Sequence, residues 1–201
     1  MKYNYITIER EYASGGREIG DELAKELNIP CYGKEILHIS AKKIGVSPER
    51  LIDLEEKATG SFLYSMYLLG TLNTGETAGL TDNQQLHIFE TNIIKELALK
   101  GPCIFVGHCA GWAIRERTDV LNAFIHAGGQ SRQERAINRY HVDPGKVDEI
   151  LKKTDKRRAN YFKANTNEKW EDKENYHMIL DSGKLGTDGC VNAIMASLIE
   201  K

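Results

Sequence analysis

The chain has 201 residues, of which 41% are hydrophobic and 28% charged, and its formal net charge is −2. This composition excludes an intrinsically disordered chain, because it supplies enough apolar side chains to bury a sizeable core. The nearly neutral charge gives no reason to expect nucleic acid or a membrane surface as the main partner.

The cysteines and the hydropathy of the chain indicate a reducing compartment. The four cysteines include no C-x-x-C pair and lie far apart, except for Cys103 and Cys109. They are therefore expected to be reduced packing residues rather than disulfides or metal ligands. The first residues become charged too early for a secretory signal, and no run approaches the roughly 18 apolar residues that a membrane span needs. We expect a cytoplasmic protein, as a monomer or a homodimer.

Residues 3–8 open the first predicted structural unit. They are rich in β-branched and aromatic side chains, which predicts a strand. A loop with two adjacent glycines, Gly15 and Gly16, follows. From Arg17 onward apolar residues recur at helical spacing, and this helix is expected to end at Asn28. A strand, a glycine loop and a helix together form half of a β–α–β unit.

The later part of the chain alternates between predicted strands and predicted helices. Residues 34–57 predict two helices, the second beginning at Ser47, because serine caps a helix and the following proline suits its first turn. Residues 59–83 lack periodicity and are rich in glycine and threonine, so we expect a loop or mobile structure around Tyr67 to Asp82. Three short apolar runs predict further strands, at Cys103–Val106, Val120–His126 and residues 178–180. This alternation is typical of a parallel sheet that is covered by helices.

The glycine loop is a partial match to the P-loop that binds nucleotide phosphates. In the template G-x-x-x-x-G-K-[ST], backbone N–H groups surround the phosphates and the lysine reaches the terminal ones. Residues 11–18 match it strictly only at Gly16, with Arg17 in the place of the lysine and Glu18 in the place of the hydroxyl that binds Mg²⁺. The start of the following helix also favours an anion. Two interpretations remain open, an atypical phosphate-binding loop and a tight turn with a solvated Arg17.

Residues 6–20, which contain this loop, resemble the opening of the bacterial cytidylate kinase-like proteins. Later segments resemble further motifs of that family in the same order, at residues 30–37, 101–110 and 153–162. The resemblance implies an α/β protein with the three-layer α/β/α P-loop NTPase fold and a five-stranded parallel sheet. It also implies a single kinase-like domain over residues 1–201. The expected parts are a core (1–33, 86–140 and 176–201), a helical acceptor-binding insertion (34–85) and a lid (141–175).

The resemblance implies ATP-dependent phosphoryl transfer. ATP would be the nucleoside triphosphate donor, and the acceptor would be a small molecule, most simply a nucleoside monophosphate such as CMP or dCMP. Mg²⁺ would be held mostly by phosphates and water, with Glu18 or Ser14 as candidate contacts and no dedicated metal ligand. The residues assigned to ATP binding are Ser14, Gly15, Gly16, Arg17, Glu18 and Arg132. Those assigned to acceptor binding are Lys34, His108, Arg135 and Asp155. Those assigned to catalysis are Arg17, Lys156 and Arg158.

A row of arginines follows the predicted strand at Val120–His126. Arg132, Arg135 and Arg139 have the i, i+3, i+7 spacing that places three guanidinium groups on one helical face. They are expected either to flank a phosphate channel or to form a solvated face.

A denser basic cluster lies in the expected lid, at residues 152–158, where five of seven side chains are cationic. Cations that close over a transferring phosphoryl group stabilise its developing charge and exclude water. Lys156 and Arg158 match the family pattern more regularly than Arg157, and we therefore prefer them. The alternative is a solvated helix end.

Three positions depart from the family pattern. Ala13 replaces a usual glycine, so if this position needs a positive φ the loop is strained or takes another shape. Gly33 replaces a usual aspartate and His108 a usual arginine, both on the acceptor side. Two alternatives follow, a kinase for a different small acceptor and a nucleotide- or anion-binding regulatory module without catalysis. His108 is expected either to contact the acceptor or to be a packed or capping residue.

Overall fold

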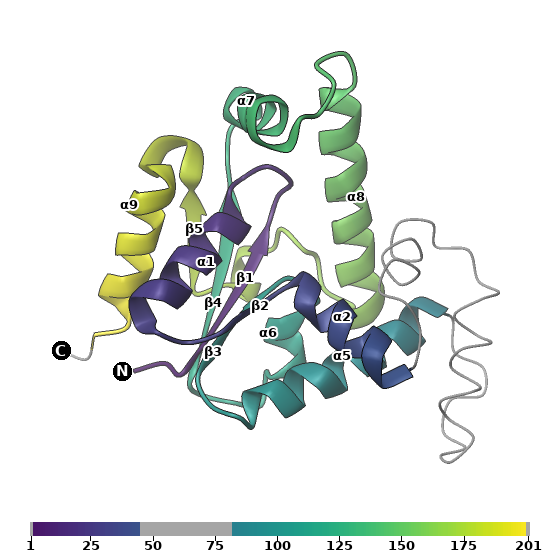
Figure 1. Cartoon of the computed structure of the whole chain (residues 1–201), viewed down its shortest axis with the longest axis vertical. Helices are drawn as coiled ribbons and strands as arrows, with labels where there is room; N and C mark the ends of the chain where they lie inside the picture. The colour runs from purple at the N-terminus through teal and green to yellow at the C-terminus, as the bar shows by residue number, and fades with distance from the viewer. Residues whose placement is uncertain (1, 45–81, 200–201) are drawn as a thin grey trace.

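The described part of the chain is built on one sheet of five parallel strands (Figure 1). The structure, a computed structural model, describes residues 2–44 and 82–199. The strands lie in the order β2-β3-β1-β4-β5. Their bounds are β1 Tyr5–Arg10, β2 Cys31–Tyr32, β3 Cys103–Val106, β4 Val120–His126 and β5 Met178–Asp181. The central β1 pairs in parallel with β3 on one side and with β4 on the other, which opens a crevice at its carboxyl end.

The predicted strands compare closely with the observed ones. The strands β3 and β4 have the predicted bounds, and β5 extends one residue further than predicted. The strand β1 begins and ends two residues later than predicted, because its pairing with β4 runs from Tyr5 to Arg10. The strand β2 was not predicted from the residue pattern, since two residues are too few to show an alternation.

Helices cover both faces of the sheet, which makes the three layers of the P-loop NTPase fold (Figure 1). Their bounds are α1 Gly16–Leu27, α2 Lys34–Ile44, α5 Asp82–Ala98, α6 Ala110–Ala113, α7 Gly129–Tyr140, α8 Val147–Thr166 and α9 Ser182–Ser197, with a short 3₁₀ helix η1 at Lys173–Asn175. The helix α1 ends at Leu27, and Asn28 forms its left-handed C-cap, as predicted.

Alternate residues of β1 enter different cores, because successive side chains of a strand point to opposite faces. Ile6 and Ile8 pack with α1 and α9, where Ile19 and Ile194 are completely buried. Tyr5 faces the other way, into a core formed with residues of α2, α5 and α6. Each face therefore has its own apolar layer, and the polar ends of the strands are left at the sheet edge.

The helices α7 and α8 stand over the carboxyl edge of the sheet (Figure 1). Ala136 of α7 and Leu151 of α8 are buried in a small cluster with Ala13, which follows β1. The predicted lid, residues 141–175, contains α8 and η1. Its Trp170 is buried against Phe124 of the sheet.

Two sequence predictions fall partly outside the described residues. The helix predicted to begin at Ser47 lies there, and so does the loop predicted around residues 67–82 except for its last residue, Asp82, where α5 begins. Among the helices of residues 2–44 and 82–199, none has the length and apolar character needed to cross a bilayer.

Candidate active site

The turn between β1 and α1, residues 11–15, is called the phosphate loop here. Ala13 has a φ of 59° and Gly15 a φ of 82°, so both lie in the left-handed region. Ala13 therefore has the strained backbone expected from its departure from glycine. In the described part of the chain, no side chain caps the N-terminus of α1 at Gly15. The first N–H groups of α1 therefore remain available for an anion, and the loop suits a phosphate group.

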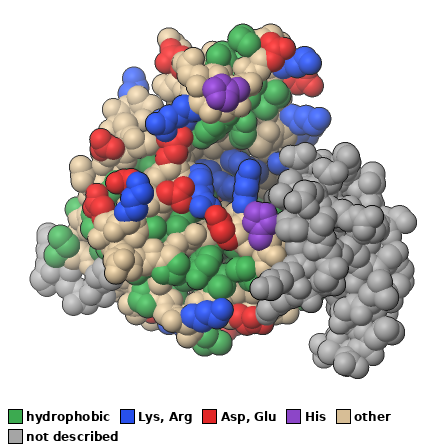
Figure 2. Space-filling view, in the orientation of Figure 1, with side chains coloured by type: hydrophobic (Ala, Val, Ile, Leu, Met, Phe, Trp, Pro, Cys, Tyr) green, Lys and Arg blue, Asp and Glu red, His purple; other side chains and the backbone are tan. Residues whose placement is uncertain are grey.

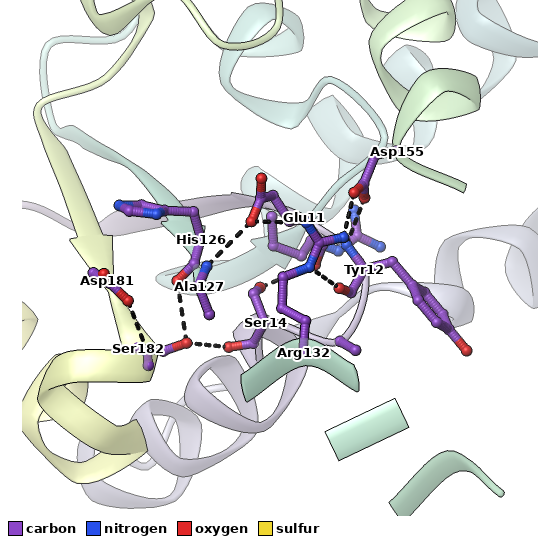
Figure 3. A network of polar contacts seen from close by, with 12 residues as sticks. Glu11, Tyr12, Ser14, His126, Ala127, Arg132, Asp155, Asp181 and Ser182 are labelled. Carbon is purple, nitrogen blue, oxygen red and sulfur yellow. Dashed lines mark hydrogen bonds and ion pairs between the residues drawn. The ribbon is translucent and has the colours of Figure 1, made fainter. Parts of the chain in front are cut away.

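Side chains from distant parts of the sequence fix this loop (Figure 3). Asp155 of α8 accepts a hydrogen bond from the Tyr12 amide at 2.7 Å and pairs with Arg132 of α7. Arg132 also donates to the Tyr12 carbonyl at 2.8 Å and lies 3.2 Å from the Glu11 carboxylate. Glu11 in turn accepts from the Ala127 amide at 3.1 Å. Both Arg132 and Asp155 thus hold the loop in place, and their predicted contacts with ATP and the acceptor stay predictions.

The far side of the loop is held by Ser182, at the start of α9 (Figure 3). Its hydroxyl is buried and contacts the carbonyl oxygens of Ser14 and His126. The Ser14 hydroxyl donates to the Glu11 carbonyl at 2.9 Å, within the loop itself. The predicted role of Ser14 in binding phosphate therefore rests on its position in the loop, since its side chain serves the turn.

Arg135 of α7 lies directly over the phosphate loop. It donates to the Ala13 carbonyl at 3.2 Å, and its guanidinium carbon is 3.2 Å from where a Cβ of Gly15 would lie. A larger residue at Gly15 would therefore meet this guanidinium. The structure places Arg135 over the phosphate loop, and its predicted contact with the acceptor stays a prediction.

Glu18 is occupied by side chains of α7. Its carboxylate contacts Arg139 and accepts from the Tyr140 hydroxyl at 3.3 Å, with Arg135 3.9 Å away. A carboxylate shared among these groups does not fit the predicted contact with Mg²⁺, and neither does the Ser14 hydroxyl that is bonded within the loop. The arginine row is not a uniformly solvated face, because Arg132 is buried and only Arg139, at 63% exposure of its side chain, is open to water.

Arg17 does not point toward the phosphate loop in this structure. Its guanidinium makes paired hydrogen bonds to Glu35 of α2 at 2.9 and 3.0 Å, and it bonds Asp21 at 2.9 Å. A Cβ at Gly33 would lie 2.5 Å from the same guanidinium, so the departure from aspartate at this position makes room for Arg17. Two carboxylates thus retain Arg17 beside α2, and the predicted substitution for the P-loop lysine requires that these bonds open.

The pair of Arg17 and Glu35 predicts a measurable dependence of stability on pH. Burial alone would raise the pKa of Glu35, but hydrogen bonds from Arg17 and the Gly33 amide outweigh it and lower the pKa to about 2, from an ordinary value of 4.5. The ionised carboxylate therefore stabilises the fold above pH 4.5, and this stabilisation is lost as the pH falls toward 2. We expect at most about 1 kcal/mol, because the side chain is nearly half exposed.

Denaturation of Glu35→Gln between pH 2 and pH 6 tests this dependence. The variant is expected to lose less stability than the wild type over the acidic part of the range. Glu22→Gln is the matched control, since Glu22 pairs with the exposed Lys25 at 2.7 Å. If the stability of Glu35→Gln and of the wild type fell equally with pH, the ion pair of Glu35 with Arg17 would not contribute to the stability of the fold.

A cavity of about 430 Å³ opens beside the phosphate loop, between the ends of β1 and β3 and the helix α8. We call it the acceptor pocket, and its polar lining includes Arg10, Lys34, His108, Arg157, Arg158 and Tyr161. Figure 2 shows Lys and Arg side chains gathered in a hollow of this face. Lys34, predicted to bind the acceptor, is exposed at the edge of this pocket.

Arg158 and Arg10 form the cationic wall of the acceptor pocket. Arg158 donates to the Arg10 carbonyl at 2.7 Å, and the Arg10 guanidinium lies close over Gly107 at the end of β3. Burial, together with the charge of Arg10, lowers the pKa of Arg158 to about 9, so it stays charged at neutral pH. Adjacent guanidinium groups that repel one another are stabilised by a bound anion. Arg10 was not predicted as a site residue, and the signal that could have found it is an arginine at the end of β1, just before the loop.

The basic cluster of the lid is divided between two faces of α8. Arg157 and Arg158 line the acceptor pocket, with Thr154 one turn before and Tyr161 one turn after. Lys156 is exposed and, within the described residues, does not line that pocket. The catalytic role of Lys156 stays a prediction. Of Lys156 and Arg157, only Arg157 lines the acceptor pocket in the described part of the chain.

His108 follows β3 and is hydrogen-bonded to a carboxylate that the sequence analysis missed. Its Nδ1 donates to Glu90 of α5 at 2.8 Å, and the Tyr161 hydroxyl donates to the other oxygen of Glu90 at 2.6 Å. Only 1% of Glu90 is exposed. Glu90 lies in the middle of α5, outside every motif, so nothing in the sequence distinguished it from the other charged residues of that helix.

A second hollow, of about 390 Å³, lies on the outer side of the phosphate loop and is called the donor hollow here. It is formed by α1, α7 and the start of α9, and its lining includes Glu18, Arg135, Arg139, Ser182, Gly183 and Thr187. Its neighbour Asp181 caps α9 by accepting from the Gly183 amide at 2.9 Å. The donor hollow thus lies against α7, the helix that carries Arg135 and Arg139.

Solved structures resemble this chain over nearly its whole length. An uncharacterized protein from Eubacterium ventriosum shares 25% identity, with a TM-score of 0.72 and coverage of 98% of this chain and 99% of the other. Shikimate kinase from Acinetobacter baumannii, solved with shikimate, shares 12% identity at a TM-score of 0.55, with coverage of 98% and 93%. A gluconokinase from Sinorhizobium meliloti shares 15% identity at a TM-score of 0.53, with coverage of 96% and 90%. These similarities show the fold of the P-loop kinases.

The sequence comparisons give the family. No functionally curated protein matches the chain in sequence. The sequence profile of the cytidylate kinase-like family matches residues 5–184, which include the phosphate loop, the acceptor pocket and α8. Since this match spans most of the chain, the protein belongs to the cytidylate kinase-like family.

Proposed function

We propose that the protein transfers the γ-phosphoryl group of ATP to a small anionic acceptor, of which CMP and dCMP are the first to consider. The observation that carries this proposal is the pair of hollows that meet one phosphate loop. The acceptor pocket reaches the loop at Tyr12, and the donor hollow reaches it through Arg135. A kinase needs this arrangement, because donor and acceptor must approach the same phosphoryl group from opposite sides.

On the donor side, the backbone amides from Gly15 to Arg17 would hold the β-phosphate at the start of α1. Arg135 already lies over Gly15, where it would neutralise phosphate charge. The nucleoside would occupy the donor hollow. Mg²⁺ bound to the phosphates would neutralise charge on their oxygens, held by phosphate and water rather than by Glu18.

On the acceptor side, Arg10 and Arg158 would bind the anionic group of the acceptor and orient its attacking oxygen. That oxygen forms a bond to the γ-phosphorus while the bond from this phosphorus to the β–γ bridging oxygen breaks, and ADP leaves. Arg158 also lies near enough to the loop, through the Arg10 carbonyl, to stabilise charge on the transferring group. The helix α8 lines this pocket and would help to exclude water once the acceptor is bound.

An ATP-consumption screen tests the proposal. We expect acceptor-dependent formation of ADP with at least one nucleoside monophosphate, CMP and dCMP first, above the rate with ATP alone. Absence of turnover with every nucleoside monophosphate would remove the nucleotide kinase. Turnover with a small phosphorylated or carboxylated alcohol instead would favour the kinase for a different acceptor, which the departures at Gly33 and His108 allow.

A regulatory module without catalysis is the second candidate, because Arg17 and Glu18 are both held by other side chains. It predicts that ATP and CMP raise the melting temperature without turnover, since any ligand that binds only the folded state stabilises it. Thermal shifts with ATP, CMP and both together distinguish the candidates. No shift with any of them would sink this idea and weaken the kinase as well.

A further inference from the structure

The backbone at the end of β3 places His108 in the acceptor pocket. Gly107, His108 and Cys109 have φ values of 85°, 59° and 52°, so three successive residues lie in the left-handed region. Only glycine adopts this region without strain, and strained residues persist where the surrounding structure holds them in place. The side chain of His108 is 8% exposed and lines the acceptor pocket. The turn therefore presents the imidazole to whatever fills that pocket.

Glu90 fixes the orientation and the hydrogen positions of this imidazole. A carboxylate accepts hydrogen bonds and does not donate them, so the 2.8 Å contact requires a hydrogen on His108 Nδ1. Burial of Glu90 is tolerated because the imidazole and the Tyr161 hydroxyl each donate to one of its oxygens. When the ring is protonated, Nε2 carries a hydrogen as well, and the ring becomes a donor that is backed by a buried negative charge.

Among the described residues, charged and titratable groups surround His108. On α5, Glu90 contacts its ring, and His87, whose own pKa is lowered by burial, lies near Glu90. The titratable or charged groups that line the acceptor pocket together with His108 are Glu9, Arg10, Lys34, Cys109, Arg157, Arg158 and Tyr161. Glu90 and Glu9 favour the imidazolium, whereas the four cations oppose it. An anion among these cations would offset their repulsion, and protonation of His108 would then become favourable.

We infer that His108, positioned by Glu90, binds the anionic group of the acceptor in its protonated form, so that acceptor binding takes up a proton. This inference rests on the acceptor pocket of the proposed function and adds a pH dependence to it. Where an arginine would bind an anion at any physiological pH, His108 binds it tightly only while protonated. Acceptor affinity is therefore expected to fall as the pH rises above the pKa of His108.

The first test follows the histidine ring protons by NMR in the intact chain, with inorganic phosphate as the probe anion. The signal that disappears in His108→Gln identifies His108. Its titration midpoint is expected to move to higher pH with saturating phosphate, and one pH unit corresponds to about tenfold weaker binding to the neutral ring. An unchanged midpoint for His108, or a shift confined to His126 or His141 near the phosphate loop and α7, would overturn the inference. This result does not depend on whether any acceptor is phosphorylated.

The second test uses turnover with CMP above about pH 7, where its phosphate is already a dianion. The KM for CMP is expected to rise about tenfold between pH 7 and pH 8.5 in the wild type, with the KM for ATP little changed. His108→Arg is expected to remove this rise and keep the low KM, while Glu90→Gln is expected to raise the KM for CMP at all pH values. His141→Gln is the control, because His141 is exposed beyond the end of α7. A rise that persists in His108→Arg would assign the pH dependence to another group and contradict the inference.

Discussion

Asp155→Ala is expected to lower the free energy of unfolding by about 3 kcal/mol. Asp155 accepts from the Tyr12 amide and pairs with Arg132, which is buried. Its removal leaves a buried guanidinium with Glu11 as its remaining carboxylate partner and leaves a loop amide without its acceptor. The loss is measured by urea denaturation, with the midpoint and the slope fitted separately.

The matched control for this variant is Asp148→Ala, on the first turn of the same helix. Asp148 is exposed and accepts only from Gln133 among the described residues, so its loss is expected to cost about 0.5 kcal/mol or less. Asp155→Asn separates charge from hydrogen bonding, because it keeps an acceptor for the Tyr12 amide. If Asp155→Ala costs no more than Asp148→Ala, then α8 does not hold the phosphate loop through this contact.

Arg158→Ala is expected to lower kcat/KM at least about 100-fold, which is the effect of removing one preorganised donor at a developing charge. Arg158 is the pocket-lining guanidinium that is bonded to the carbonyl of Arg10, next to the phosphate loop. The measurement is steady-state turnover with the best acceptor of the screen, together with the free energy of unfolding of the same variant. Arg158→Lys keeps the charge and is expected to recover only part of the activity, because an ammonium lacks the planar fork of donors.

Two lysines of α8 serve as comparisons. Lys152→Ala is the control, since Lys152 is exposed and does not line the acceptor pocket in the described part of the chain. Lys156→Ala tests the sequence prediction directly. A loss comparable to that of Arg158→Ala would confirm a catalytic Lys156 and require α8 to rotate or close. An unchanged rate for Arg158→Ala would remove the proposed acceptor side of the site.

The residue pattern predicted the elements that carry the site because each has a strong local signal. Alternating and continuous apolar runs marked β3 and β4, and the helical spacing after Arg17 marked α1. The two-residue β2 had no such signal, and the end of β1 was moved by pairing with β4. Local patterns predict elements well where a whole face is buried and poorly where a long-range pairing sets the boundary.

The interaction partners of the charged residues were harder to predict, because the type of a charged side chain does not determine which residue it pairs with. Arg17, in the place of the P-loop lysine, is held by Glu35 on another helix. Arg132 contacts Tyr12, which lies 120 positions away, and Glu90 meets His108 across 18 positions. A long flexible side chain reaches several neighbours, and only the packing of α7, α8 and α5 selects one of them.

The sequence by itself determined the parallel sheet, the position of the phosphate loop and the family, since these depend on hydrophobic periodicity, glycine placement and contiguous motifs. The sequence also indicated that Ala13 would be strained if its φ were positive, and its φ is 59°. Only the tertiary structure decided which cations line the proposed acceptor pocket, namely Arg10 and Arg158, and which hold the loop, namely Arg132. The physical reason is that electrostatic partners are chosen by distance and burial in space, which no local pattern of residues encodes.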